Sequence, residues 1–422
     1  MTDKTHRLVR EDIFWVGALD FDLRVFDIIM YSDYGTSYNS YIVKGTKKTI
    51  LFEVVKDKFF DEFLERLKGV CSLDEIDAVV VSHTEPDHAG AMGKLLQLRP
   101  DLEVIGTPTA LRYLKQVTNM DFTGRPVKDH ERMDIGGKTL EFLFAPLLHW
   151  PDTMYTYIHE AKTLVTCDSF GCHFASDKVF NDQIIEMDDL MTAYKYYFDV
   201  IMGPFKANVL RALDKIENLE IETICNGHGP VLRTDIQKFI GLYREWSQPT
   251  VTEKHKLVIG YLSSYGYTKK IAEKLHEGAI SNPNVEVKFY NLEDISTENF
   301  VAELNDAKGM MIGGPTFLSD ALPPIHSILG NLNPIIHKGM LAFAFGTYGW
   351  SGEGVDNVVQ RLCQLKLKQP FEGFKVNFNP DENDLNRAYE IGVEFSTKVQ
   401  LAKNARIQAT CDDTGHCEIE II

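Results

Sequence analysis

The stretch VSHTEPDHAG, Val81 to Gly90, decides how the first half of this chain is interpreted. It follows an apolar run, precedes a helical segment, and holds His83, Glu85, Asp87 and His88 within six positions. Histidine and carboxylate side chains are metal ligands and also general acids or bases. Because alternate residues of an extended segment point to the same side, the first three can converge while His88 reaches a second centre. Taken alone, such a group is more often a hydrogen-bonded or solvated loop.

Three further candidate ligands follow separate apolar runs. His149 comes after EFLFAPLL, Asp168 comes after LVTC, and His228 lies between two glycines after ETIC. A site at one edge of a sheet needs metal-competent side chains at the ends of several strands. The sequence therefore predicts that these three residues join the Val81–Gly90 stretch in a single site.

The order of strand-like and helical segments in the 422-residue chain changes near EWSQPTVTEKHK, residues 245–256. We interpret this stretch as a domain linker. Before it, KFFDEFLERLKGV predicts an amphipathic helix with Phe60, Phe63, Leu64 and Leu67 on one face. Strand-like runs dominate the rest of this half: SYIVKG, KTILFEVV, DAVVVSH, LEVIGT, TLEFLFAP, MYTYIHE and TLVTCDS. This pattern predicts an α/β domain over residues 1–250, with two packed sheets covered by helices.

After the linker, strand and helix alternate in five units, beginning with KLVIGYLSS and TKKIAEKLHEGAI. Strict alternation of this kind predicts a doubly wound parallel five-stranded sheet over residues 255–402. Residues 403–422 remain as a C-terminal tail, in which Cys411 and Cys417 flank a polar segment. A metal or redox pair is one interpretation of these cysteines, and an ordinary mobile tail is the favoured one.

The composition narrows the classes of partner and location. The chain has 44 basic and 61 acidic residues, a net charge of −17, which argues against nucleic acid and anionic membranes as partners. Seven scattered cysteines without a C-x-x-C motif indicate a reduced, cytoplasmic chain rather than a disulfide scaffold. The first fifteen residues lack the apolar core of a signal peptide, and no stretch is apolar enough to span a membrane.

Three strand ends of the second half share small, hydroxylated and aromatic residues. In YLSSYGYTKK, residues 261–270, a strand turns into a helix, whose N-terminus favours an anion such as a phosphate. An ordinary helix capped by Thr268 explains this stretch equally well. GGPTFLSDALPP and GTYGWSGEGVDN follow the third and fourth strands. Ligands of doubly wound folds bind outside the carboxyl ends of strands, where small and aromatic residues accept a flat ring.

The ligand run, followed by separated His, Asp and His, resembles the metallo-β-lactamase superfamily, whose domains are αββα sandwiches. Hydrolases of that superfamily have His where this chain has Glu85, and a carboxylate there favours iron and a redox site. The loops of the second half resemble those of a flavodoxin, which implies FMN as the ligand. By that resemblance the phosphate is held by Ser263, Ser264, Tyr265, Gly266, Tyr267 and Thr268. The isoalloxazine ring is bordered by Pro315, Thr316, Phe317, Thr347, Tyr348, Gly349, Trp350, Ser351 and Gly352.

The two domains in this order resemble the flavodiiron proteins, also called A-type flavoproteins, over nearly the whole chain. The resemblance implies two irons held by two sets of ligands: His83, Glu85 and His149 for one, and Asp87, His88 and His228 for the other, with Asp168 as the bridge. It implies reduction of dioxygen to water or of nitric oxide to nitrous oxide. Two electrons from the iron pair and two from reduced FMN match the four that one dioxygen needs.

The same resemblance implies how electrons arrive. The family forms a head-to-tail homodimer, or a dimer of dimers, in which the flavin of one subunit meets the irons of the other, here with Trp350 near the junction. A separate rubredoxin, ferredoxin or flavin reductase is expected as the donor. His173 and Tyr197 are expected to donate hydrogen bonds in the substrate pocket, although roles in the core are equally compatible with their sequence context.

Two rival interpretations remain open on the sequence. One is a zinc hydrolase fused to an electron-carrier domain, against which Glu85 speaks. The other is a redox sensor without catalysis, against which the complete set of seven ligands speaks. No motif encodes the choice between dioxygen and nitric oxide. Dioxygen is favoured because family members without extra domains often reduce it.

Overall fold

A computed structural model describes residues 5–249 and 254–402, together with the backbone of residues 407–411 and 417–421. The chain divides into two compact units, residues 1–248 with 407–420 and residues 249–406 with 421–422. In the tail, β22 (Ile407–Cys411) and β23 (Cys417–Ile421) form a two-stranded sheet. The side chains of Cys411 and Cys417, for which a metal or redox pair is one interpretation of the sequence, lie outside the described residues.

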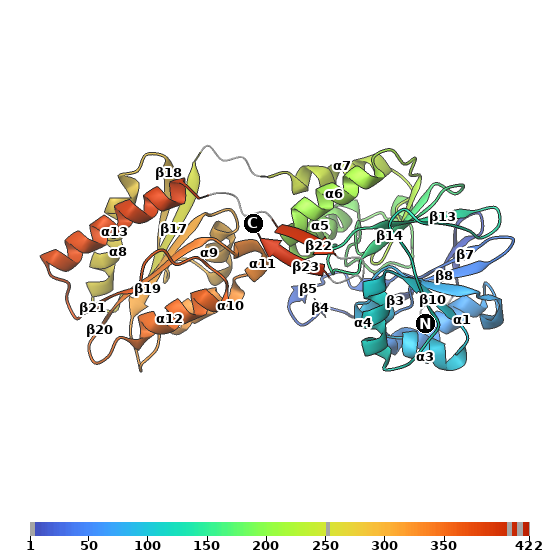
Figure 1. Ribbon diagram of the computed structural model, residues 1–422, viewed down its shortest axis with the longest axis horizontal. Helices are drawn as coiled ribbons and strands as arrows, with labels where there is room; N and C mark the ends of the chain where they lie inside the picture. Colours follow the sequence, from blue (N-terminus) through green and yellow to red (C-terminus); the bar gives the residue numbers. More distant parts are fainter. Residues whose placement is uncertain (1–4, 250–253, 403–406, 412–416, 422) are drawn as a thin grey trace. The chain divides into compact units, whose positions relative to one another are not determined.

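The first unit contains two main sheets (Figure 1). In the larger sheet, β9 runs parallel to both of its neighbours, and its strand order is β1 (Arg7–Arg10), β2 (Ile13–Trp15), β7 (Tyr41–Lys44), β8 (Thr49–Phe52), β9 (Ala78–Val81), β10 (Glu103–Gly106) and β11 (Gly124–Pro126). The order of the second sheet is β12 (Arg132–Asp134), β13 (Thr139–Phe144), β14 (Met154–Ile158), β15 (Thr163–Cys167) and β16 (Thr223–Asn226). Two short pairs complete the strands: β3 (Ala18–Asp20) with β6 (Thr36–Tyr38), and β4 (Val25–Phe26) with β5 (Met30–Tyr31).

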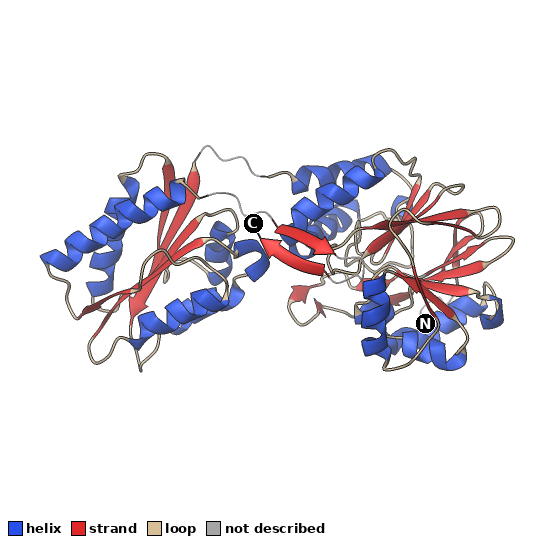
Figure 2. Ribbon diagram, in the orientation of Figure 1, coloured by secondary structure: helices blue, strands red, loops and turns tan. Residues whose placement is uncertain are grey.

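Buried side chains explain why the two sheets stack. Phe52 and Val80 of the larger sheet and Phe142 and Val165 of the smaller one belong to one buried apolar cluster. A second buried cluster packs the outer faces against helices. Figure 2 shows the helices of this unit in blue beside its red strands. The helices of this unit are α1 (Phe60–Lys68), α2 (Pro86–Ala89), α3 (Met92–Leu98), α4 (Pro108–Thr118), α5 (Met187–Tyr197), α6 (Lys206–Ile216) and α7 (Ile236–Ser247). The predicted sandwich of two sheets covered by helices is confirmed.

The second unit is built on one five-stranded sheet in which every pairing is parallel. Its strand order is β18 (Val285–Asn291), β17 (His255–Tyr261), β19 (Gly309–Pro315), β20 (Leu341–Tyr348) and β21 (Phe374–Asn377). This is the 2-1-3-4-5 order of flavodoxin-like folds. The helices are α8 (Tyr267–Ile280), α9 (Thr297–Leu304), α10 (Pro323–Asn331), α11 (Pro334–His337), α12 (Glu353–Gln364) and α13 (Glu382–Gln400). The predicted doubly wound sheet is confirmed.

Separate apolar clusters cover the two faces of this sheet. Ile271 of α8 and Phe395 of α13 pack on one face, and Phe300 of α9 and Ile325 of α10 pack on the other. In Figure 1 the same division is visible in the yellow-to-red part of the chain. Because helices cover both faces of the central strands, the ends of these strands are where the sheet can meet a ligand.

The contact between α8 and α13 depends on two glycines. A Cβ on Gly392 would lie 2.2 Å from the carbonyl oxygen of Leu275, and a Cβ on Gly278 would lie 2.1 Å from that of Tyr389. No real Cβ approaches a backbone oxygen so closely, so any side chain at either position must push the helices apart.

We expect Gly392→Ala to destabilise the second unit by roughly 1–3 kcal/mol, the usual cost of overpacking. Thermal unfolding followed by circular dichroism measures this loss. Gly330→Ala is the matched control, because a Cβ there meets no atom within 4 Å and alanine favours a helix. Equal melting temperatures for the two variants would contradict the close helix contact.

Candidate functional site

The structure brings all seven predicted ligands to one edge of the first unit. His83 and Glu85 follow β9, and Asp87 and His88 lie in the short helix α2. Asp168 follows β15 directly, His228 lies just beyond β16, and His149 lies in the loop between β13 and β14. These side chains come from both sheets, so the site exists only because the sandwich aligns the strand ends.

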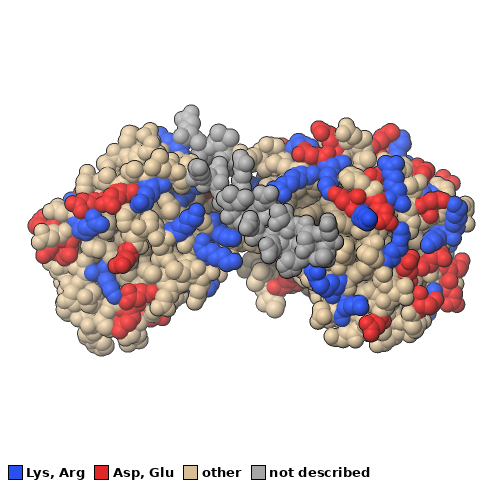
Figure 3. Space-filling model, viewed as in Figure 1, with Lys and Arg blue, Asp and Glu red and all other residues tan. Residues whose placement is uncertain are grey.

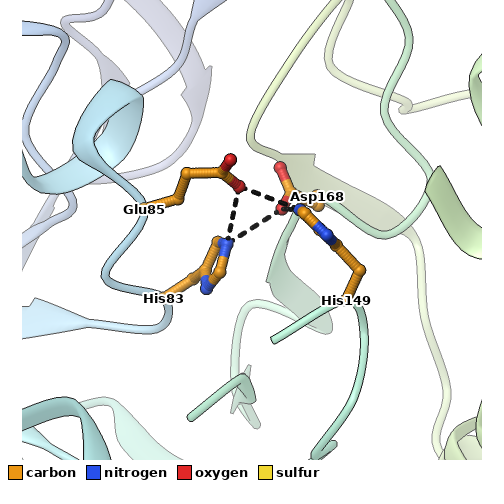
Figure 4. Close-up of side chains that lie close together, drawn as sticks. All are labelled: His83, Glu85, His149 and Asp168. Atoms are coloured by element: carbon orange, nitrogen blue, oxygen red, sulfur yellow. Dashed lines mark hydrogen bonds and ion pairs between the residues drawn. The ribbon is translucent and has the colours of Figure 1, made fainter. Parts of the chain in front are cut away.

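Four of these residues form a first group, drawn in Figure 4: His83, Glu85, His149 and Asp168. Glu85 Oε2 lies 3.1 Å from His83 Nε2 and 2.9 Å from His149 Nε2. Asp168 Oδ2 lies 3.3 Å and 3.4 Å from the same two nitrogens. Two imidazole nitrogens and two carboxylate oxygens therefore converge on one small volume.

The second group consists of Asp87, His88 and His228, all buried. His228 Nε2 lies 3.0 Å and His88 Nε2 lies 3.5 Å from Asp87 Oδ2. The other oxygen of Asp168, Oδ1, lies 2.9 Å from His88 Nε2 and 3.5 Å from His228 Nε2. One carboxylate thus directs one oxygen at each group, which is the arrangement that a bridge between two cations requires.

Outer contacts fix the orientation of two of the imidazole rings. His83 Nδ1 lies 3.4 Å from Asp152 Oδ1, and Asp152 Oδ2 accepts hydrogen bonds from the amide and hydroxyl of Thr84. His228 Nδ1 donates to the carbonyl oxygen of Ser37 at 2.6 Å. A ring whose Nδ1 is held from outside presents the lone pair of Nε2 inward, as a metal ligand must. Sequence reasoning missed Asp152, although it stands three residues after His149.

The electrostatics of the cluster call for cations. Asp87 Oδ1 and Oδ2 and Asp168 Oδ2 are buried and accept no hydrogen bond. Burial alone would raise the pKa of Asp168, yet His88, His149 and His83 hold that pKa well below its usual range. Carboxylates that stay ionised in a dry interior need positive charge beside them. The mixed oxygen and imidazole donors suit two non-haem irons.

The pKa values of the histidines shift in the opposite direction, upwards. Burial would lower the pKa of His83, but Asp152, Glu85 and Asp168 raise it well above its ordinary value. Burial likewise disfavours protonated His149, while Asp168 and Glu85 raise its pKa to about 9. In the metal-free protein, protons on these rings therefore balance the carboxylates, and they occupy the nitrogens that a metal would use.

Beside the second group lie the two residues expected in a substrate pocket. Tyr197 donates a hydrogen bond to Asp168 Oδ1 at 3.1 Å. His173 Nδ1 contacts the hydroxyl of Thr36 at 3.0 Å, and its Nε2 is buried without a hydrogen-bond partner. The Phe26 ring stacks on His173 with centroids 4.3 Å apart.

Asp27, in the turn between β4 and β5, lies close to the ligand Glu85, and sequence reasoning missed it. Burial and the nearby carboxylate of Glu85 raise the pKa of Asp27 to about 6. Asp27 and Ile28 both have positive φ angles, 46° and 71°, which is strained for a β-branched residue such as Ile28. No pattern in the sequence signals the contact, because it depends on a hairpin whose strands are two residues each.

The second candidate site lies at the carboxyl ends of β17, β19 and β20. Gly266 is the N-cap residue of α8 with φ of 83°, so Thr268 lies inside the first turn and is not the cap. The hydroxyls of Thr268 and Thr347 are 2.8 Å apart, and Ser263 Oγ accepts from the amide of Lys269 at 3.1 Å. The first turn of a helix has backbone N–H groups without intrahelical partners, which suit a phosphate.

The other two loops join this turn. The amide of Thr316 donates to the carbonyl oxygen of Thr347 at 2.8 Å, and Thr316 Oγ1 is buried without a hydrogen-bond partner. Around them Tyr265, Phe317 and Trp350 are 87%, 62% and 91% exposed. Large, mostly exposed rings beside an unpartnered hydroxyl are what a flat, polar-edged cofactor such as the FMN isoalloxazine would cover. The remaining predicted contacts lie on the same three loops: Ser264, Tyr267, Pro315, Tyr348, Gly349, Ser351 and Gly352.

Surface charge and hydropathy are unremarkable for such a protein. Lys and Arg side chains lie among Asp and Glu side chains on the visible face of each unit (Figure 3). Within the described residues, every helix is too short or too polar to cross a bilayer.

Comparison with known proteins agrees with both sites. Residues 36–229 match the family model described as ODP family beta lactamase, and residues 259–392 match the flavodoxin model. A flavo-diiron protein of Clostridium acetobutylicum is 37% identical over 93% of this chain and 99% of its own length. A nitric oxide reductase of Moorella thermoacetica is 35% identical over 93% of this chain and 98% of its own.

Solved structures give the same result. The flavodiiron protein of Giardia intestinalis is 30% identical with a TM-score of 0.65, covering 94% of this chain and 97% of its own. The rubredoxin oxygen:oxidoreductase of Desulfovibrio gigas is 27% identical with a TM-score of 0.66, covering 94% and 100%. These matches, with the donor groups and the flavodoxin fold, account for one FMN and two non-haem irons as the cofactors. The chain belongs to the flavodiiron protein family, and it is an FMN- and diiron-dependent oxidoreductase.

Proposed function

We propose that this protein removes dioxygen by reducing it to water, and that it also accepts nitric oxide, which it reduces to nitrous oxide. The observation that carries this proposal is the carboxylate of Asp168, with one oxygen facing each group of donors. When bound, the irons and FMN together supply the four electrons that one dioxygen requires. The printed names of the relatives, one an oxygen oxidoreductase and one a nitric oxide reductase, support both substrates.

In this proposal each ligand has a defined role. His83, Glu85 and His149 would hold one iron, Asp87, His88 and His228 would hold the other, and Asp168 would offer one oxygen to each group. Asp152 and the carbonyl of Ser37 hold two of the rings in the orientation that binding needs. Glu85 in place of an imidazole supplies the oxygen-rich donor set that favours iron over zinc.

The residues beside the second group would receive the substrate. Tyr197 presents its hydroxyl to Asp168, and His173 presents a ring nitrogen that has no other partner. Phe26 packs against His173 and keeps that side apolar, which admits a small uncharged gas. The unpartnered Nε2 of His173 would supply a hydrogen-bond donor where reduced oxygen or nitrogen atoms gain charge.

The flavin is proposed to bind on the three loops of the second unit. Residues 263–268 would hold the phosphate through the first turn of α8, while residues 315–317 and 347–352 border the ring. Trp350 and Phe317 supply aromatic surface for it.

A head-to-tail homodimer, alone or paired into a dimer of dimers, is proposed to bring flavin and irons together. Each site has exposed apolar residues next to it that such an interface would cover. Beside the metal ligands these are Ile28, Ile29 and Tyr31 of the β4–β5 hairpin, and beside the flavin loops they are Phe317, Leu318 and Trp350.

Electrons would come from a separate carrier, and the name of the Desulfovibrio relative favours a rubredoxin over a ferredoxin or a flavin reductase. The scattered cysteines favour a cytoplasmic location.

Anaerobic reduction followed by mixing with each gas tests the function. We expect dioxygen to restore the absorbance of oxidised flavin within a single turnover, without release of peroxide. Nitric oxide should restore it more slowly. Stopped-flow absorbance and a peroxide assay measure this. A colourless protein, a single zinc in the metal site, or flavin that stays reduced under both gases would contradict the proposal.

Two variants separate the cofactors. Asp168→Ala should lose both irons and keep FMN, because both groups lose their shared charge. Thr268→Ala should keep iron and bind FMN at least about tenfold more weakly, since a hydrogen bond to a charged group contributes roughly 1.5–3 kcal/mol. Metal analysis and flavin titration measure both, with Thr397→Ala on exposed α13 surface as the control. Full iron content in the Asp168 variant would refute the bridge.

Iron binding should also release protons. The raised pKa values of His83 and His149 mean that both rings are protonated at pH 7 in the metal-free protein, whereas iron needs neutral rings. Iron affinity should therefore rise with pH from 6 to 9, and Fe²⁺ added at pH 7 in weak buffer should acidify the solution. An indicator dye measures this. A pH-independent affinity would show that the two histidine rings are already neutral in the metal-free protein.

A further inference from the structure

Three consecutive residues at the metal centre are each bonded to a different buried tyrosine. Tyr197 donates to Asp168 at 3.1 Å, Tyr155 donates to the hydroxyl of Ser169 at 2.7 Å, and the amide of Phe170 donates to the hydroxyl of Tyr243 at 2.8 Å. All three tyrosines are at most 3% exposed. Phenylalanine would fill the same space without the cost of burying a hydroxyl. The three phenol groups are therefore candidates for a role in the chemistry of the site.

The rings continue from these tyrosines towards the surface. Tyr243 stacks on Phe170 at 4.4 Å and lies 5.5 Å from Tyr194. Tyr194 lies 5.6 Å and Tyr243 lies 6.4 Å from Trp246, which is partly exposed near the end of α7. Phe198 fills the space between Tyr243 and Trp246, at 5.0 Å and 5.1 Å. A series of aromatic contacts thus leads from Phe170, two residues along the chain from the bridging carboxylate, to the partly exposed Trp246.

Tyrosine and tryptophan are the side chains that lose one electron most readily in a protein without a metal or thiolate. A series of them in contact lets an electron vacancy move in short steps. Lys195 lies 5.3 Å from the Trp246 ring and would by itself resist a positive charge there. The carboxylate of Asp199, 2.5 Å from the same ammonium, offsets that effect.

We propose that the aromatic series from Phe170, close in the chain to Asp168, through Tyr243 to Trp246 removes oxidising equivalents from the metal centre when electrons run short. This inference rests on the proposed dioxygen chemistry and goes beyond it, because it assigns a protective activity. Dioxygen needs four electrons, and a subunit that holds fewer is left with an oxidant among its own ligands. The route would carry that oxidant away from the imidazoles.

The step balances in electrons and protons. For each missing electron, Trp246 gives one electron inward through Tyr243 and becomes an indole radical cation, which loses its N–H proton to water. A one-electron reductant at the surface, such as a small thiol, then returns the electron, and water returns the proton. The thiol is oxidised, the metal centre is reduced, and the protein is unchanged.

Freeze-quench electron paramagnetic resonance on the holoprotein tests the route. The protein is reduced with fewer than four electrons per subunit, mixed with dioxygen and frozen. We expect an indole radical signal that Trp246→Phe abolishes and Tyr243→Phe lowers at least tenfold, with iron and FMN contents unchanged. After repeated cycles, peptide mapping should find oxidised tryptophan at position 246, and added thiol should suppress it.

Trp150 provides the matched comparison, because its ring lies 5.1 Å from that of the ligand His83 and is also partly exposed. A radical that persists in Trp246→Phe and disappears in Trp150→Phe overturns the proposed route. Dioxygen uptake without any tryptophan signal overturns it as well and leaves the proposed function standing. Absence of dioxygen uptake overturns the proposed function and this inference with it.

Discussion

The sharing of one buried carboxylate by two sets of imidazoles is the constraint on which the first unit depends. Asp168 sits where burial strongly disfavours a charge, yet it remains ionised because four ring nitrogens lie within 3.5 Å of its oxygens. Those nitrogens come from three separate segments, 83–88, 149 and 228, so the carboxylate can be satisfied only in the folded chain. Cations that replace the protons of the rings then bind the folded state and stabilise it.

The architecture explains how such a concentration of polar groups is tolerated. The strand interiors are apolar on both faces and carry the packing, which leaves the ends of β9, β15 and β16 free to hold ligands. The same division recurs in the second unit, where both faces of the parallel sheet are covered and three strand ends form the flavin loops. In both units, stability and chemistry are assigned to different parts of the same strands.

Much of this was predictable because the signals are local. Alternating and β-branched runs identified β7–β10 and β13–β15, and the position of polar residues just after such runs identified the seven ligands. What escaped prediction depends on tertiary contact. Asp152, Asp27 and the carbonyl of Ser37 contact ligands that are distant in sequence, and short strands such as β4 and β5 have no periodicity of their own. The sequence made Thr268 a candidate N-cap. In the structure Gly266, with its positive φ, is the N-cap, so the helix begins at Tyr267 and Thr268 lies in its first turn.

Each of the four apolar clusters in the described part of the chain lies wholly within one unit. Each unit therefore has a hydrophobic core of its own. We expect each unit to fold and to bind its cofactor independently of the other. A newly made molecule could acquire its metals before, after or without its flavin. A chain that holds FMN but no iron would then be yellow and inactive, and binding of iron alone would complete it.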